Sequence, residues 1–313
     1  METARRKNPG SALFLFVAAL IWGVAFVAQR VGMDYVGPFT FNAVRNLIGA
    51  VVLVPCIFFM DRIRGNKGHH GKEKLPESAS GRAGSKRAGW LKENGMLLRG
   101  GLVTGFFLSI AGNLQQIGIK YTTVGKAGFI TAMYIVLVPL LGIFIGKKVG
   151  WKIWASVVLA VVGLYLLSMT SSTIRLEKGD MYVLLSALAF AFQITAVDYY
   201  AARTDSVRLA CLEFAVCGLI TLVPMFLLET PTWGGLWAAR LPILYAGVLS
   251  CGVAYTFQIL GQKGTDPAVA SLIMSLEAVI SALAGWLLLG QSMAGREIIG
   301  CVVMFVAIVL AQI

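Results

Sequence analysis

Residues 39–60 read FTFNAVRNLIGAVVLVPCIFFM, an apolar run long enough for a helix to cross a bilayer. Similar runs recur along the whole 313-residue chain, which is 58% hydrophobic and only 13% charged. Soluble domains carry about 25% charged residues. The sequence therefore predicts an all-α polytopic membrane protein.

We predict ten membrane-spanning helices and one long polar segment, residues 61–96, which we expect to be a flexible loop. The first helix follows a basic start without a clear cleavage site, so we interpret it as a retained helix and not as a signal peptide. The predicted helices cover residues 12–33, 39–60, 97–119, 124–145, 151–170, 180–201, 207–228, 241–260, 268–289 and 296–312.

The net charge of +12 comes from Lys and Arg clustered in a few loops, which is typical of topology signals and not of nucleic-acid binding. With a cytoplasmic N-terminus, nineteen of the 27 basic residues fall on the inner side and seven on the outer side. We therefore expect an inner-membrane protein with both termini in the cytoplasm. For the basic segment 61–96, binding of anionic lipid or of a partner is the alternative to a purely topological role.

Residues 111–146 and 254–289 repeat each other at a fixed offset of 143, with ten of 36 positions identical. The identical pairs include Gln115/Gln258 and Lys120/Lys263. This match predicts a duplication of five helices. Because five is odd, the copies must insert in opposite orientations, which predicts two inverted five-helix repeats.

Three motifs resemble the EamA-type members of the drug/metabolite transporter superfamily. They are IWGVAFVAQRVG at 21–32, YTTVGKAGFITAMYIVLVPLLG at 121–142 and SLIMSLEAVISALAGWLLLG at 271–290. The chain departs from the family where an acidic residue would close the fourth and ninth helices, and at Ala278, where a proline is common. The resemblance implies EamA-like repeats at 12–170 and 179–313 with a linker at 171–178, and the charge distribution makes residues 1–11 a cytoplasmic N-terminus.

Motifs for cofactor-dependent chemistry are absent from the sequence. It has no GxxxxGK[ST] phosphate loop and no HExxH, and its five cysteines lack metal-ligand spacing. Both histidines, His69 and His70, lie in one polar segment. We therefore expect no cofactor, no metal and no enzymatic activity.

Arg45 is a permanent cation inside a predicted span, where a charge is costly unless it faces a cavity or a partner. Asn42, Arg45 and Asn46 are spaced i, i+3 and i+4, so they share one helix face. This polar face indicates a ligand or gate residue. The alternative is an arginine that extends to the membrane surface about 10 Å away.

Glu277 lies about midway along the ninth predicted helix, and the offset of 143 pairs it with Tyr134. Two related polar positions near the midplane are what a central site needs. Because an apolar setting disfavours a charged carboxylate, Glu277 is our candidate proton carrier. The alternative is a neutral glutamic acid that joins two helices by a hydrogen bond.

Glu213 falls at the position of Arg45 when the first helices of the two halves are aligned at an offset of 168. The two residues would then lie about 10 Å from opposite surfaces as gate elements of opposite charge. A glutamate that reaches the lipid headgroups is the alternative.

Amide and aromatic side chains on several helices complete the predicted cavity. Each alone is typical of an interhelical hydrogen bond, but together they indicate a polar lining. We predict coupling or gating by Glu277, Glu213 and Arg45. The predicted substrate-binding residues are Trp22, Gln29, Asn42, Arg45, Asn46, Asn113, Gln116, Tyr134, Gln193 and Gln258.

These features predict a secondary active transporter that moves a small metabolite, an amino acid or a drug by alternating access, with proton-coupled efflux as one candidate mode. A membrane-embedded enzyme acting on lipid or a lipid-linked substrate is the alternative, with Glu213 and Arg203 as its only weak candidates. A passive channel is a second rival. The expected partners are a small-molecule substrate and the lipid bilayer, without nucleic acid, and a homodimer is left open.

Overall fold

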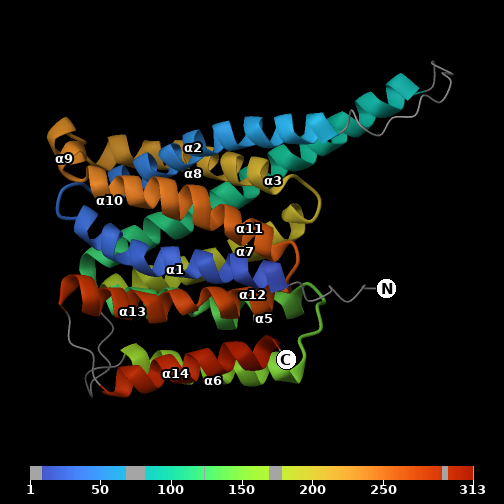
Figure 1. Ribbon diagram of the computed structural model, residues 1–313. Helices are drawn as coiled ribbons and strands as arrows, with labels where there is room; N and C mark the ends of the chain where they lie inside the picture. The colour runs from blue at the N-terminus through green and yellow to red at the C-terminus, as the bar shows by residue number, and fades with distance from the viewer. Residues whose placement is uncertain (1–8, 68–81, 123, 169–177, 291–294, 313) are drawn as a thin grey trace.

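A computed structural model describes residues 9–67, 82–122, 124–168, 178–290 and 295–312, and every regular element among them is a helix (Figure 1). The predicted all-α fold is confirmed for this part of the chain. Most of the predicted N-terminal segment and of the predicted linker lies outside the described residues, as does the middle of segment 61–96.

The helices follow one another along the chain with short connections. The earlier ones are α1 (Pro9–Gly32), α2 (Pro38–Lys67), α3 (Arg82–Tyr121), α4 (Val124–Thr131), α5 (Tyr134–Phe144) and α6 (Trp151–Ser168). The later ones are α7 (Lys178–Ala201), α8 (Ser206–Leu228), α9 (Trp233–Ala238), α10 (Arg240–Leu244), the π-helix η1 (Tyr245–Tyr255), α11 (Thr256–Gln262), α12 (Pro267–Met274), α13 (Leu276–Leu289) and α14 (Gly295–Gln312).

Eight stretches of the described chain are long and apolar enough to cross a membrane. Two shorter apolar helices, Trp151–Leu166 and Ile298–Leu310, fall where the remaining two spans were predicted. A polytopic helical membrane protein is therefore confirmed, whereas the count of ten spans stays a prediction.

The outside of the helices carries large apolar side chains, such as Phe144 and Leu227, which are 86% and 76% exposed. The interior holds carboxylates and amides, including Glu213, Glu277 and Gln193. Because lipid tails offer no hydrogen bonds, such polar groups must find partners inside the protein or in a water-filled cavity. The polarity of this interior therefore points to a functional centre within the bundle.

Helices α2 and α8 pack against each other and are joined near both ends. At one end the Glu229 carboxylate accepts hydrogen bonds from the backbone N–H groups of Phe39 and Thr40, at 2.9 and 2.7 Å. At the other end Arg208 forms an ion pair of 2.7 Å with Asp61. This arrangement links a helix from the first part of the chain to one from the second.

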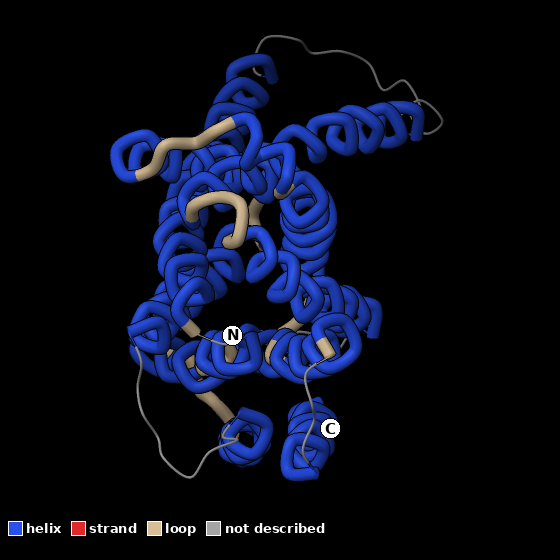
Figure 2. The backbone as a smooth tube through the Cα atoms, turned by 90° about the vertical axis from the view of Figure 1, so that its left-hand side faces the viewer, coloured by secondary structure: helices blue, strands red, loops and turns tan. Residues whose placement is uncertain are grey.

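Helices α6 and α14 also pack against each other, and Figures 1 and 2 show them as a pair set to one side of the main bundle. They bring together the last helix before residue 169 and the last helix of the chain. No side chain of either helix lines the cavity described below.

The fourth and ninth predicted spans are each broken into two helices. The first break lies at residues 132–133, between α4 and α5, and the second lies at Ser275, between α12 and α13. Pro139 removes one backbone donor from α5, but no proline stands near the second break. The breaks therefore do not share a proline as their cause, and both place polar side chains at mid-span.

We predicted that segment 61–96 is a loop, but both of its ends are helical. Helix α2 continues to Lys67 and α3 begins at Arg82, so both helices extend beyond the bundle (Figure 1). We read the basic composition as a loop, but Ala, Arg, Lys, Leu and Glu are good helix formers, and each end continues an apolar helix. That part of the prediction was wrong.

Candidate functional site

A buried cavity of about 40 Å³ lies among the helices, with room for a few water molecules. Its walls combine one cation, one carboxylate, several amides and five aromatic rings. The lining residues are Trp22, Phe26, Gln29, Arg45, Gln115, Thr131, Tyr134, Phe190, Gln193, Ile194, Ser250, Tyr255, Gln258, Met274 and Glu277.

Arg45 of α2 supplies the cation of this cavity. Its side chain is buried, with the residue only 4% exposed, and its guanidinium carbon lies 5.9 Å from the ring centre of Phe41. Among the described residues, no carboxylate lies within ion-pair distance of Arg45 and no residue accepts a hydrogen bond from Nη1 or Nη2. Arg45 thus presents an unneutralised positive charge, which suits an anionic group of a ligand.

The third guanidinium nitrogen, Nε, starts a chain of hydrogen bonds away from the cavity. Arg45 Nε donates to Asn42 Oδ1 at 2.9 Å, and Asn42 Nδ2 donates to Asn113 Oδ1 at 2.6 Å. Asn113 Nδ2 then donates to Thr221 Oγ1 at 3.1 Å. Asn46 also donates to Asn42 Oδ1, at 3.0 Å. These amides fix the position of Arg45 from the side opposite the cavity.

Glu277 supplies the carboxylate, and the Tyr134 hydroxyl donates a hydrogen bond of 3.0 Å to its Oε1. Tyr134 is the first residue of α5 and Glu277 the second of α13, so each follows directly on a helix break. Both residues are buried, at 3% and 5% exposed. The two breaks therefore place this pair together at the cavity.

Glu213 of α8 is a second carboxylate and is fully buried, but it does not line the cavity. It accepts a hydrogen bond of 2.6 Å from Gln193 Nε2, and Gln193 Oε1 accepts one of 3.3 Å from Gln258 Nε2. A side chain in this position does not reach the lipid headgroups, which was the alternative for Glu213.

Three buried polar atoms of the cavity lining have no hydrogen-bond partner among the described residues. They are the indole nitrogen of Trp22 and the Oε1 atoms of Gln29 and Gln258. Because buried polar groups are usually satisfied, such atoms indicate a place for water or for a polar ligand. The cavity therefore offers one free donor and two free acceptors besides Arg45.

The π-helix η1 forms part of the wall and contributes Ser250 and Tyr255. The ring of Tyr255 packs edge-on against Trp22, with 4.7 Å between the ring centres. π-helical turns are rare and are often found at functional sites.

One protein family matches two separate stretches of the chain. Residues 10–169 and residues 177–312 each match the EamA-like transporter family. Together the two matches cover nearly the whole chain. This chain belongs to the EamA-like transporter family. Its resemblance to that family, inferred from three motifs, is thereby confirmed.

Relatives of this EamA-family protein span nearly its whole length. An "uncharacterized transporter" of Archaeoglobus fulgidus is 27% identical over 96% of this chain and 85% of its own. The "uncharacterized transporter YoaV" of Bacillus subtilis is 22% identical over 92% of this chain and 91% of its own. A solved crystal structure with 17% identity covers 97% of both chains with a TM-score of 0.72, a likeness that shows the fold alone.

Membership of the EamA-like family makes this protein a multi-pass membrane transporter, with the lipid bilayer and a small-molecule substrate as its partners. The names of its relatives agree with the prediction that it is not an enzyme. The candidate pair for the enzyme alternative is not assembled, since Arg203 is exposed and packs on Tyr199 whereas Glu213 is buried beside Gln193.

The cavity of this EamA-family transporter contains seven of the residues predicted from the sequence: Trp22, Gln29, Arg45, Tyr134, Gln193, Gln258 and Glu277. The other five lie outside the lining: Asn42, Asn46, Gln116 and Glu213 are buried, and Asn113 is half-buried. Of these, Gln116 donates to the backbone carbonyl of Gln29 at 3.3 Å.

Sequence reasoning missed eight lining residues: Phe26, Gln115, Thr131, Phe190, Ile194, Ser250, Tyr255 and Met274. Gln115 carried a usable signal, because it is identical to Gln258 in the internal repeat. The apolar members carried none, since they resemble the many lipid-facing residues of the same helices.

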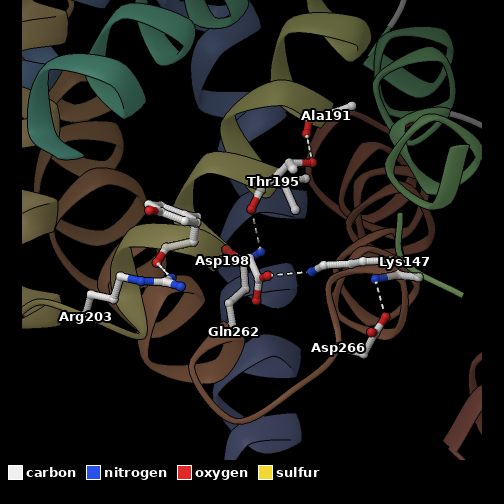
Figure 3. A network of polar contacts seen from close by, with 10 residues as sticks. Lys147, Ala191, Thr195, Asp198, Arg203, Gln262 and Asp266 are labelled. Atoms are coloured by element: carbon white, nitrogen blue, oxygen red, sulfur yellow. Dashed lines mark hydrogen bonds and ion pairs between the residues drawn. The ribbon is translucent and has the colours of Figure 1, made fainter. Parts of the chain in front are cut away.

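A polar network lies at the end of the bundle that we predicted to be cytoplasmic (Figure 3). Lys147 follows α5 and forms an ion pair of 2.7 Å with Asp198 of α7, so the pair joins segments from the two family matches. Beside it, Gln262 Nε2 donates to the backbone carbonyl of Ile194 at 3.2 Å. Asp266 caps α12 by accepting from the Ala268 N–H at 2.9 Å.

The opposite end of the bundle is more open. A pocket of about 600 Å³ lies there between residues 33–40 and residues 226–232. An ion pair between Arg30 and Asp34 also lies at this end, but both residues belong to one short stretch of chain. The two halves are joined at this end as well, because the Glu229 carboxylate accepts hydrogen bonds from the N–H groups of Phe39 and Thr40.

Proposed function

We propose that this EamA-family protein is a secondary active transporter that moves a small metabolite, an amino acid or a drug across the cytoplasmic membrane by alternating access. The observation that carries the proposal is a single buried cavity that contains an unneutralised guanidinium, a carboxylate and three unpartnered polar atoms. Empty of ligand, such a set of groups would be costly to bury. A polar cargo bound between them would offset that cost.

Alternating access would follow from two inverted repeats, near residues 12–170 and 179–313. Two features support this symmetry. The helix breaks lie at corresponding positions, and Tyr134 contacts the residue that is 143 positions further along the chain. In addition, α2 packs on α8 and α6 on α14, so each helix of these pairs meets its own counterpart. Residues on the symmetry axis of an inverted repeat are expected to meet in this way.

Within the cavity, Arg45 would bind an anionic group of the cargo. Glu277 would couple transport to protons, because it can pass between a neutral and an ionised form in a buried site. The Lys147–Asp198 ion pair would close the cytoplasmic side, in a protein with both termini in the cytoplasm. At about 40 Å³ the cavity holds only a few waters, so the cargo would bind after the walls separate.

The proposal is tested by a thermal-shift screen of the purified protein against amino acids, nucleosides, sugars, organic acids and cationic drugs. A ligand at a hundred times its dissociation constant should stabilise the protein by about 2.7 kcal/mol. We expect at least one hit that weakens in Arg45→Ala or Glu277→Gln and persists in Arg30→Ala, an exposed control.

The hit is then tested for concentrative uptake or efflux in proteoliposomes. Flux that saturates and builds a gradient identifies a carrier. Flux that never exceeds equilibration would contradict active transport and favour a channel.

A further inference from the structure

A chain of three hydrogen-bonded side chains connects the interior of α8 to the cavity. Gln258 Nε2 donates to Gln193 Oε1, and Gln193 Nε2 donates to Glu213 Oε1. The three residues are at most 2% exposed and come from α11, α7 and α8. Gln193 and Gln258 line the cavity, whereas Glu213 lies outside its lining.

The direction of this chain is set at its buried end. Oε1 of the Glu213 carboxyl group accepts the hydrogen bond from Gln193, and its Oε2 has no partner among the described residues. Gln193 must therefore turn its NH2 group toward Glu213, which leaves its oxygen for Gln258. Gln258 donates an N–H to that oxygen. Its own Oε1 is left without a partner among the described residues.

We propose that Glu213 is a positioning residue that acts through Gln193 to hold the Gln258 oxygen as an acceptor for an N–H group of the cargo. This inference rests on the proposed transport function and specifies the chemistry of the cargo. Gln29 reinforces it, because its Oε1 is a second unpartnered acceptor in the same lining.

Arg45 orients a second chain in the opposite sense. A guanidinium donates and never accepts, so Asn42 turns its oxygen toward Arg45 Nε and its NH2 group toward Asn113. The remaining guanidinium nitrogens of Arg45 are then free to donate at the cavity. Arg45 thus leaves N–H donors at the cavity, and the chain that begins at Glu213 leaves the Gln258 oxygen there as an acceptor.

A cargo that complements the Arg45 guanidinium and the Gln258 oxygen must carry an anionic group and at least one N–H donor. An amine on a carboxylic acid is the simplest such ligand. A carboxylic acid without the nitrogen would satisfy Arg45 and leave the two glutamine oxygens unpaired, which is costly in a buried site.

The test compares the twenty common L-amino acids with their deaminated carboxylic acids, such as alanine with propanoate, by equilibrium binding to the purified full chain. We expect wild type to bind at least one amino acid about tenfold or more tightly than its deaminated partner. Glu213→Gln and Gln193→Met should each reduce this preference about tenfold, because nothing then fixes the direction of the Gln258 amide. In Glu213→Gln, whose site lies outside the cavity lining, affinity for the deaminated acid should fall much less than affinity for the amino acid.

A double-mutant comparison separates positioning from a general structural role. If Glu213 acts through Gln258, Glu213→Gln has no further effect on the preference in a Gln258→Met background. Thermal unfolding confirms that each variant is folded, and Gln193→Met replaces Glu213→Gln should the latter fail to fold.

The proposal is overturned if wild type binds no amino acid in preference to its partner, if both single variants keep the wild-type preference, or if the effects add in the double variant. Transport is measured separately in proteoliposomes. Transport of a cargo without any N–H dependence would remove this inference and leave the proposed function standing. Selective binding without any transport would remove the proposed function instead.

Discussion

The hydroxyl of Tyr134 donates a hydrogen bond of 3.0 Å to Glu277, and the two residues are 143 positions apart. The same offset aligns residues 111–146 with residues 254–289 in the sequence. The sequence repeat therefore relates two residues that touch each other. Contact between equivalent residues is expected only close to a symmetry axis, which makes this pair a natural target for the first experiments.

Removal of the Tyr134 hydroxyl tests whether the pair serves coupling. In Tyr134→Phe the ring remains and Glu277 loses its hydrogen-bond donor. We expect unfolding to become easier by about 1–3 kcal/mol, because a buried acceptor is left unsatisfied. We also expect gradient-driven transport to fall more than exchange of cargo across the membrane. Both activities are measured in proteoliposomes, and an equal decline in both would indicate a structural role alone.

Replacement of Arg45 tests the cation of the cavity. Arg45→Lys keeps the charge but loses the planar fork of donors, and Arg45→Leu loses both. We expect cargo affinity to fall about tenfold or more in Arg45→Leu and less in Arg45→Lys. Binding to the purified variants measures this effect. The matched control is Arg30→Leu, since Arg30 is exposed and pairs with Asp34 within its own stretch of chain; an equal loss in the control would argue against a specific role.

The Lys147–Asp198 ion pair is expected to hold one end of the bundle closed. Its side chains are only 31% and 11% exposed, so breaking it should cost more than the loss of a fully exposed ion pair, about 1–3 kcal/mol of stability. The main effect should be on the access of reagents to the cavity, and the effect on the free energy of unfolding should be secondary. We expect Lys147→Gln to speed the labelling of Ile194→Cys, at the cavity, by a maleimide added on the side of Lys147.

That labelling is done in a background without the five native cysteines. Exposed Lys152→Gln at the same end is the control. An unchanged labelling rate in Lys147→Gln would mean that the ion pair does not limit access.

Close packing between α1 and α13 depends on Gly23. A Cβ atom at this position would lie 2.3 Å from the Cβ of Ile280 and 2.9 Å from the carbonyl oxygen of Glu277. We therefore expect Gly23→Ala to destabilise the protein by about 1–3 kcal/mol and to disturb the Glu277 end of the cavity. Gly142→Ala in α5 is the matched control, because its nearest neighbour would be 3.8 Å away. Thermal unfolding of both variants in detergent compares them.

Hydropathy and polar spacing predicted much of the site, because both depend on local chemistry. The spacing of Asn42, Arg45 and Asn46 placed them on one face, and hydrogen bonds join Asn42 to each of the other two. A charged or amide side chain in an apolar helix must find a polar neighbour, so its position alone marks the interior. This reasoning identified Glu213, Glu277 and Arg45, all three of which are buried.

The helix breaks and the apolar walls could not be predicted in the same way. The chain breaks at Ser275 without a glycine or proline beside it, so no local signal marks the position. Tyr255 and Met274 line the cavity, yet Tyr165 and Met181 are exposed on the outside of the bundle. In a helix that is apolar on all sides, only tertiary packing decides which side faces the cavity.

The clamps at both ends of the α2–α8 pair restrict how this protein can move. Glu229 ties the start of α2 to the end of α8, and Asp61 ties the other end to Arg208. We therefore expect this pair to turn as a unit more readily than it slides or parts. When the bundle opens on either side of the membrane, distances between α2 and α8 should stay constant. Distances from this pair to the other helices should change.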